Sequence, residues 1–340
     1  MKILSMAMKV IVSLMLMLII SGTLVQGESL TSGSMKIKTS DGRESRVSVS
    51  QIKTPTNFEG RLKNTTGFYS LKCSYKDNYF SFNVPTPVVE GINRTQVEKM
   101  IEKLLSFYDT VFERYARIFN NKPFGYKFNI VFGKTANGYP YNRIYSISKI
   151  SNIYANFNPF TESHDPFSGF QNSIMLHEIG HSLFAIIVGN MNHPKFKFIE
   201  EGFIEYMVVK DPAKYGQKTG FRLTKARADK MKGLAQVDLD LSVWGKEAVM
   251  SAPAPDGYLG VTHHLSGIEF MKTFIGIFGE DKFPEFFMRL KAKDMEITRG
   301  DYGTSQIKEV FRKMGYSNEE INKFEKNYHE RLKNNVFTLE

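Results

Sequence analysis

The most informative segment of this sequence is His177-Glu178-Ile179-Gly180-His181, which lies inside an apolar run from Ile174 to Val188. The apolar run predicts a helix, on which residues four positions apart share one face, so both imidazoles can reach a single metal ion. Glu178 then lies beside that metal, where it can take a proton from a metal-bound water instead of binding the metal. The spacing therefore predicts zinc-dependent hydrolysis of a peptide bond by an activated water.

The helix around these histidines is apolar on every side, which strengthens the prediction. Its apolar members are Ile174, Met175, Leu176, Ile179, Leu183, Phe184, Ile186 and Ile187. Two imidazoles and a carboxylate are costly to bury in such a helix unless a partner such as a metal ion satisfies them. The alternative is that one face of the helix lies in water and the histidines are solvated.

A second apolar, helix-like stretch from Phe198 to Met207 carries three glutamates and offers a third zinc ligand. Zinc held by two histidines needs at least one further protein ligand and an open position for water. We favour Glu201 as that ligand, because the glycine after it lets the backbone come close and because Glu205 lies one turn later on the same face. There Glu205 can accept the second N–H of a ligand histidine. For Glu200 we expect a solvated helix face.

With these residues in view, the sequence resembles the gluzincin metallopeptidases, the clan of thermolysin and the zinc aminopeptidases. The resemblance rests on His177-Glu178-Ile179-Gly180-His181 and on the later segment Glu201-Gly202-Phe203-Ile204-Glu205-Tyr206, and it extends from about Lys127 to Leu290. It implies a zincin-like domain that binds one zinc ion per chain and acts on a peptide or protein substrate. The implied roles are zinc ligand for His177, His181 and Glu201, general base for Glu178, and partner of a ligand histidine for Glu205.

The sequence departs from the pattern of the aminopeptidases in that clan, and it does not fit the metzincin class. The aminopeptidases carry a Gly-x-Met-Glu-Asn segment that this sequence lacks, and the spacing from His181 to Glu201 is one residue longer than theirs. The metzincins require glycine at position 184 and histidine at position 187, where this chain has Phe184 and Ile187, so that class is excluded. His193 stays an alternative third ligand, although the proline after it favours a surface turn.

The resemblance also implies a residue that stabilises the oxyanion of the tetrahedral intermediate. Related enzymes place a tyrosine or histidine three residues before a glycine in a helix, and His264 precedes Gly267 in this way, in a helix-like stretch that ends near Gly279. Tyr258 is the alternative. A hydrogen-bond donor at either position would stabilise the charge that develops beside zinc. Each residue is equally typical of an ordinary polar position near the start of a helix.

The spacing of apolar and polar residues predicts the strands and helices that must position these residues. Residues 28–90 alternate in places between apolar and polar types and are rich in turn residues, which predicts a small β-rich region that ends near Pro85-Thr86-Pro87. From Asn93 to Ile118 the apolar residues keep helical spacing, so one long amphipathic helix is expected. Strands are expected at Lys127–Phe132 and Ile150–Phe157.

The fold class expected from these segments is α+β. A zincin-like metallopeptidase domain over residues 91–340, with a mostly helical C-terminal half, would follow the β-rich N-terminal region 28–90. In gluzincins the strand before the zinc helix is a sheet edge that aligns the substrate backbone, so the resemblance implies this role for Ile153 to Asn156. The turn-rich segment from Gly138 to Asn142 is expected to be a loop.

Residues 1–27 have the pattern of a signal peptide. Lys2 and Lys9 precede an apolar run from Val10 to Ile20, and small residues follow up to Gly27. We therefore expect an exported protein, secreted or periplasmic, without a stable membrane span in the mature chain; an uncleaved anchor is the alternative. Cys73 is the only cysteine, which excludes an intramolecular disulfide.

The formal net charge is +10, and removal of a leader with two lysines and no acidic residue leaves +8. The basic residues are spread along the chain, without the arginine- and aromatic-rich pattern of a nucleic-acid groove. We therefore expect no nucleic-acid partner, and instead a solvated surface or attraction to anionic cell surfaces.

The sequence as a whole predicts an exported metallopeptidase with a single zinc ion. The first alternative is a catalytically weak zinc-binding protein that binds a peptide or cell-surface ligand without cleaving it, and the second is a secreted binding module without metal. Glu178 favours the peptidase, because a structural zinc site needs no base and usually has four protein ligands.

Overall fold

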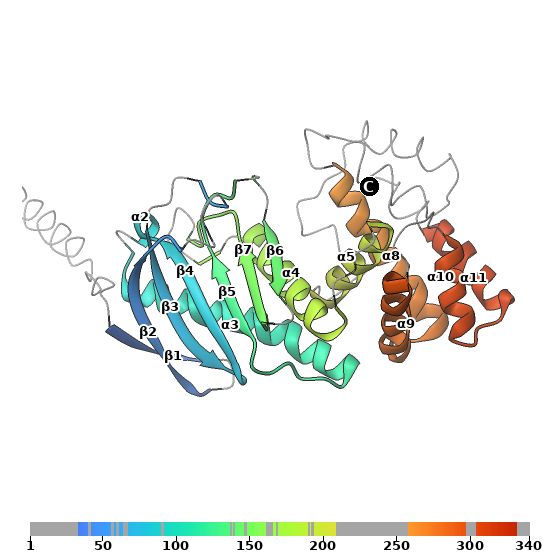
Figure 1. Ribbon diagram of the computed structural model, residues 1–340, viewed down its shortest axis with the longest axis horizontal. Helices are drawn as coiled ribbons and strands as arrows, with labels where there is room; N and C mark the ends of the chain where they lie inside the picture. Colours follow the sequence, from blue (N-terminus) through green and yellow to red (C-terminus); the bar gives the residue numbers. More distant parts are fainter. Residues whose placement is uncertain are drawn as a thin grey trace, which may run out of the picture.

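The computed structural model of the protein is a mixed α+β structure in which a seven-stranded sheet lies beside a group of helices (Figure 1). It describes residues 33–331 except 40–41, 56–57, 59–60, 64–66, 90–91, 137, 139, 146–147, 161–165, 168, 190, 192–193, 209–257 and 297–303. The predicted α+β class is confirmed. The signal-like segment 1–27 lies outside the described residues.

The sheet has the spatial order β1-β2-β3-β4-β5-β7-β6. Its strands are β1 (Gly33–Lys38), β2 (Glu44–Lys53), β3 (Gly67–Tyr75), β4 (Asn78–Pro85), β5 (Lys127–Val131), β6 (Tyr141–Tyr145) and β7 (Ile150–Tyr154). The first four strands are antiparallel neighbours, β4, β5 and β7 run parallel, and β6 pairs antiparallel with β7. Because β4 pairs with β5, the predicted division of the chain near residue 90 falls between two adjacent strands of one sheet.

Alternating side chains explain why the N-terminal region forms strands. Met35 and Ile37 on β1 and Val47 and Val49 on β2 are buried, while the residues between them face away from the core. Strands β3 and β4 are joined by a two-residue turn, Lys76-Asp77, in which both residues have positive φ angles of 45° and 59°. This is the backbone geometry that a tight hairpin requires.

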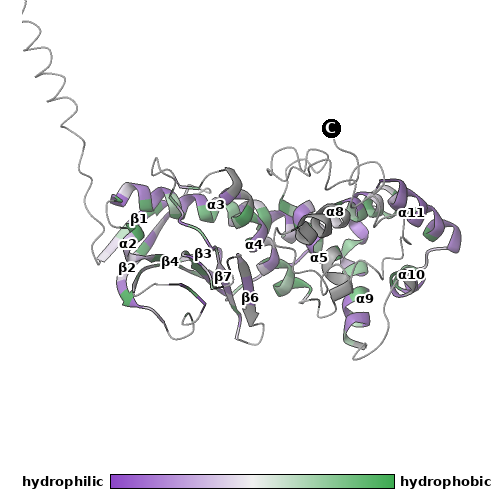
Figure 2. Cartoon of the chain, turned by 90° about the horizontal axis from the view of Figure 1, so that it is seen from above, coloured by the Kyte–Doolittle hydropathy of each residue, from purple (hydrophilic) through white to green (hydrophobic). Residues whose placement is uncertain are grey.

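The expected long helix is confirmed as α3 (Arg94–Phe119). The side chain of Asn93 accepts a hydrogen bond from the backbone N–H of Gln96 at 3.0 Å, and the side chain of Gln96 accepts one from the Asn93 N–H at 2.9 Å. Figure 2 shows α3 on one side of the strands. Tyr108 on α3 packs edge-on against Phe80 and Phe128 of the sheet, with ring centroids 5.0 and 5.3 Å apart.

Every described element after β7 is helical. These elements are α4 (Gly169–Ile187), α5 (Pro194–Val208), α8 (Tyr258–Phe278), the short 3-10 helix η2 (Glu280–Lys282), α9 (Phe283–Glu296), α10 (Thr304–Lys313) and α11 (Asn318–Arg331), while α2 (Thr86–Val89) lies earlier, after β4. Phenylalanine side chains pack between these helices. For example, the ring centroids of Phe203 on α5 and Phe287 on α9 lie 4.5 Å apart. None of the described helices is both long enough and apolar enough to cross a membrane.

Two expectations for the strands near α4 are wrong. The segment from Gly138 to Asn142 was expected to be a loop, but its last two residues begin β6. The strand before α4 in the chain, β7, was expected to be the sheet edge, but it lies between β5 and β6. The edge strand is β6, because the chain turns back and pairs antiparallel on the outer side of β7.

Two glycines let α5 pack very closely against its neighbours. A Cβ atom at Gly202 would lie 2.0 Å from the carbonyl carbon of Gly267 on α8, so the backbones of the two helices are in contact. A Cβ atom at Gly180 on α4 would lie 2.7 Å from Cγ2 of Ile204 on α5. These crossings fix the distances between the three helices that carry most of the candidate site residues.

We predict that Gly202→Ala destabilises the protein by about 3 kcal/mol, because its methyl group would overlap the backbone of α8 and force the helices apart. Gly276→Ala on α8 is the matched control, since a Cβ there meets nothing within 4 Å. That change should stabilise the protein by about 0.5–1 kcal/mol, as expected for alanine in place of glycine on an open helix face. Urea denaturation measures both free energies, and equal effects would contradict the glycine contact.

Candidate metal centre

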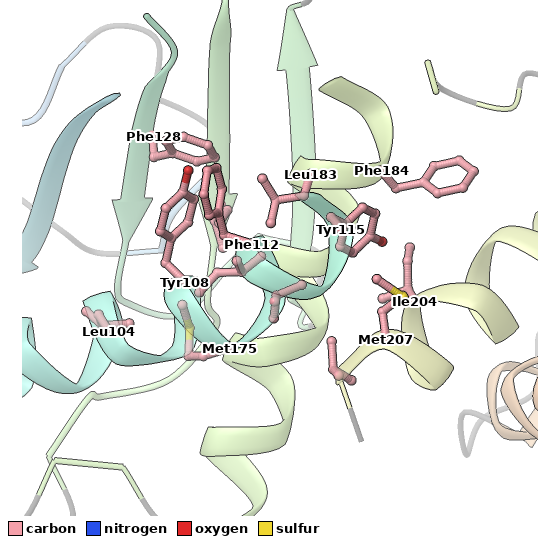
Figure 3. Packing of buried hydrophobic residues seen from close by; sticks show 14 of the residues in the cluster. Leu104, Tyr108, Phe112, Tyr115, Phe128, Met175, Leu183, Phe184, Ile204 and Met207 are labelled. Carbon is pink, nitrogen blue, oxygen red and sulfur yellow. The ribbon is translucent and has the colours of Figure 1, made fainter. Parts of the chain in front are cut away.

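The site is built on α4 and α5, which are held together by apolar packing against α3. Figure 3 shows Tyr108, Phe112 and Tyr115 of α3 among buried side chains from α4 and α5. The hydroxyl group of Tyr115 donates a hydrogen bond to the backbone oxygen of Gly180 at 3.1 Å, in the middle of the histidine segment. The helix that carries the histidines is therefore fixed by a buried polar contact as well as by apolar area.

Two histidines of α4 and one glutamate of α5 converge on a single point. The Nε2 atoms of His177 and His181 lie 2.9 Å apart. One carboxylate oxygen of Glu201, Oε2, lies 3.1 Å from Nε2 of His177 and 3.0 Å from Nε2 of His181. These three side chains form a group that can hold a metal ion.

Each histidine also contacts a carboxylate through its other ring nitrogen. Nδ1 of His177 lies 3.0 Å from Oε1 of Glu205, and Nδ1 of His181 lies 3.0 Å from Oε1 of Glu200. When a carboxylate accepts the Nδ1–H, the Nε2 atom of the same ring carries a lone pair. Two such lone pairs and an oxygen of Glu201 then face one another, which is a stable arrangement only around a cation.

The electrostatics at His177 also favour a cation at this site. Burial alone would lower the pKa of this imidazole, but the carboxylates of Glu205 and Glu201 outweigh burial and hold the pKa well above its usual value. The carboxylates therefore favour a positive charge at this point, whether it is carried by a proton or by a metal ion. Metal binding and protonation at His177 must then compete.

The expected solvated face for Glu200 is wrong. Its side chain is buried, with 3% of the residue exposed, and it contacts His181 as described above. The expected contact between Glu205 and a histidine is present and involves His177. A signal for Glu200 was available in the sequence, because two ligand histidines need two partners for their Nδ1 atoms and Glu205 supplies only one.

Glu178, the expected base, is buried on α4 beside His177, with 5% of the residue exposed. Its backbone oxygen accepts hydrogen bonds from Nδ2 of Asn142 at 2.9 Å and from Oγ of Ser182 at 3.1 Å. Asn142 lies on the edge strand β6, so this contact ties the position of Glu178 to the edge of the sheet.

Asn142 belongs to a polar cluster that sequence analysis did not find. Its Nδ2 donates to Oγ of Ser182 at 2.6 Å, and Oγ of Ser151 on β7 lies 2.8 Å from the same Ser182 oxygen. Ser151 also donates to Oδ1 of Asn142 at 3.3 Å. The cluster joins α4 to both outer strands. Its one signal in the sequence is Ser182, a polar residue in an otherwise apolar part of the helix.

The remaining candidates are only partly described. His193 lies outside the described residues. Tyr258 and His264 lie on α8, where the structure describes the backbone but not these side chains. The contact of Gly267 with Gly202 brings this face of α8 against α5 beside Glu201, and His264 lies one helical turn before Gly267 on the same face.

Comparison with known proteins yields no relatives that would identify the site. No protein-family model matches the sequence, and no curated protein matches it. The resemblance to gluzincins therefore stays a prediction that rests on the histidine and glutamate segments themselves.

The contacts of Glu200, Glu201 and Glu205 predict a ranking of metal affinities. Glu201→Ala removes a donor atom and should lower metal affinity more than any other glutamate change. Glu200→Ala and Glu205→Ala should each cost about 10 to 100-fold, and by similar amounts, since each removes the partner of one ligand histidine. Titration of the metal against a chelator measures these affinities, with Glu319→Ala on the exposed face of α11 as the unaffected control. Wild-type affinity in Glu200→Ala would contradict its contact with His181.

Proposed function

We propose that this protein is an exported, zinc-dependent metallopeptidase of gluzincin type, with one zinc ion bound by His177, His181 and Glu201. The observation that carries the proposal is the convergence of two Nε2 atoms and one carboxylate oxygen within 3.1 Å of one another. Donor atoms about 2.0–2.1 Å from a tetrahedral zinc ion lie about 3.3 Å apart, close to the spacing seen here. Two imidazoles and a carboxylate are also a donor set that suits zinc.

The number of ligands supports catalysis over a structural role. Among the described residues, three side chains converge, whereas structural zinc sites usually have four protein ligands and no place for water. Zinc bound at this point would polarise the substrate carbonyl and lower the pKa of a water molecule. The alternative, a zinc-binding protein that holds a ligand without cleaving it, does not explain why Glu178, the residue after the ligand His177, is buried.

The chain's own residues supply the proton transfers. Glu178 takes the proton of the attacking water on its carboxylate and then passes it to the nitrogen of the leaving amine. Asn142 and Ser182 position Glu178 through its backbone oxygen.

The substrate backbone has a natural place on β6. No described strand pairs with the outer side of β6, so its backbone groups there can accept an extended peptide as an additional strand. The hydrogen bond from Asn142 to the Glu178 oxygen links this strand to the helix that carries the base. A peptide on β6 would therefore lie in a fixed relation to Glu178.

Export is supported by the signal-like residues and by the cysteine content. Cys73, the only cysteine, is buried, and burial raises the pKa of its thiol to about 12. A thiol with so high a pKa is almost entirely protonated and therefore unreactive at neutral pH. The chain needs no disulfide and exposes no reactive thiol at Cys73, which suits an oxidising compartment.

The decisive test is Glu178→Gln. Glutamine keeps the shape of the side chain but does not accept a proton, so hydrolysis of peptides should fall by at least about 100-fold while one zinc per chain is retained. Metal analysis and digestion of a peptide library measure the two properties on the same sample. Glu319→Gln controls for the loss of one carboxylate. Full activity in Glu178→Gln, or loss of its zinc, would contradict the assigned role.

The oxyanion donor is tested separately on α8. If His264 has this role, His264→Ala should lower the rate of the chemical step by about 100 to 1,000-fold without loss of zinc, because the donor acts only as charge develops on the substrate oxygen. Tyr258→Phe should then have a small effect. Steady-state kinetics that show the reverse ranking would transfer the role to Tyr258.

A further inference from the structure

The face of the sheet opposite α3 carries a depression, lined by both polar and apolar side chains, that the proposed peptidase site does not use. Its volume is about 680 Å³, and its floor is formed by side chains of β2, β3, β4 and β5. Apolar residues such as Leu71, Phe82 and Phe128 point to the other face, where α3 covers them, whereas Phe68 and Val131 pack with Phe58 on this side. The depression lies over the middle of the sheet, whereas the histidines of the metal centre lie on α4, which contacts the edge strand β6 through Asn142.

The register of the strands builds a polar row that crosses this floor and continues to β7 beyond it. Directly paired positions from β2 to β7 carry Ser48, Lys72, Ser81, Asn129 and Asn152. Adjacent strands lie about 4.8 Å apart, so these five residues form a row about 19 Å long across the strands. A hydrogen bond from Nδ2 of Asn129 to Oδ1 of Asn152, 2.8 Å long, fixes the orientation of these two side chains.

The depression is positively charged. Arg46, Lys72 and Lys127 line it, and none of the described residues that line it is an aspartate or glutamate. Lys72 and Lys127 form no ion pair with any other residue that the structure describes. Cations that no described acidic residue neutralises attract an anionic ligand, and the low-dielectric wall beside them strengthens that attraction.

A wall and an exposed aromatic ring give the depression its shape. Phe58, with Ile52 and Pro55 beside it, closes one side, and it is held in place because its ring packs edge-on against Phe68 and Tyr154 at 5.9 and 6.0 Å between centroids. Tyr79 on β4 is 56% exposed and lines the floor. Its ring offers an apolar face with a polar tip, as is common where proteins bind amphipathic ligands.

We propose that this depression binds an anionic polysaccharide. Hydroxyl and amide side chains both donate and accept hydrogen bonds, so the row of serines and asparagines matches the hydroxyl groups of a sugar chain. Arg46, Lys72 and Lys127 match its carboxylate or sulfate groups, and Tyr79 packs on the apolar face of a sugar ring. An acidic peptide fits less well, because the strands here are already paired on both sides and a peptide backbone finds no sheet edge to join.

The test measures binding of the full chain to polygalacturonate, dextran sulfate, neutral dextran and polyglutamate by isothermal titration calorimetry at low salt. The two anionic polysaccharides should bind, with neutral dextran at least about 10-fold weaker, and binding should weaken as salt is added. Lys72→Gln combined with Lys127→Gln should reduce binding about 10-fold or more. Lys323→Gln combined with Lys326→Gln on the exposed face of α11 removes the same charge and should change nothing. An equal loss in this control pair would show that net charge alone drives binding and would overturn the site.

A second comparison separates a sugar chain from any acidic polymer. Tyr79→Ala should weaken polygalacturonate binding about 3 to 10-fold and leave the weaker binding of polyglutamate unchanged. Polyglutamate that binds as tightly as polygalacturonate would overturn the polysaccharide assignment in favour of an acidic peptide. Glu178→Gln should bind polysaccharide like the wild type, because this inference does not rest on the peptidase proposal. The two proposals can therefore fail independently.

Discussion

The arrangement of α4 and α5 depends on how buried charge is compensated between them. Glu178, Glu200, Glu201 and Glu205 are each no more than 9% exposed, and the last three contact the two imidazoles. Carboxylates are costly to bury without a compensating charge. A divalent cation at the converging donor atoms offsets half of this charge, and the Nδ1–H groups of His177 and His181 satisfy two further carboxylates. The free energy of metal binding is therefore part of the folding free energy of this region.

Those parts of the site that are local in sequence could be predicted, because helical periodicity alone places them. His177, Glu178 and His181 share one helix, and Glu201 and Glu205 share another, so their relative positions follow from spacing. The role of Glu200 was missed although the need for a second Nδ1 partner indicated it, because spacing alone does not show which side of α5 is buried. That orientation is set by the contact of Gly202 with Gly267, which comes from a distant part of the chain and leaves no periodic signal.

The strands show the same division between local and distant information. β5 and β7 were found from their apolar residues, but their place in the sheet was not, because strand order depends on pairing between segments. β6 begins in a segment rich in turn residues, which does not indicate a strand. The role of its residue Asn142 could not be predicted, because it depends on hydrogen bonds with Ser151 and Ser182 from other elements. The sheet-face depression was likewise invisible in the sequence, since its row of polar residues exists only across paired strands.

The pairing of β4 with β5 also determines how this chain can be divided. A fragment that lacks β1 to β4 would leave the backbone groups of β5 unpaired beside buried residues such as Phe128 and Ile130, and it would uncover the apolar side of α3 that Phe80 and Phe82 now cover. An exposed apolar strand edge next to an exposed apolar helix face is a site for aggregation. The β-rich region therefore cannot be removed as a separate module. Its strands cover apolar surface of β5 and α3 that would otherwise promote aggregation of the part of the chain that carries the metal group.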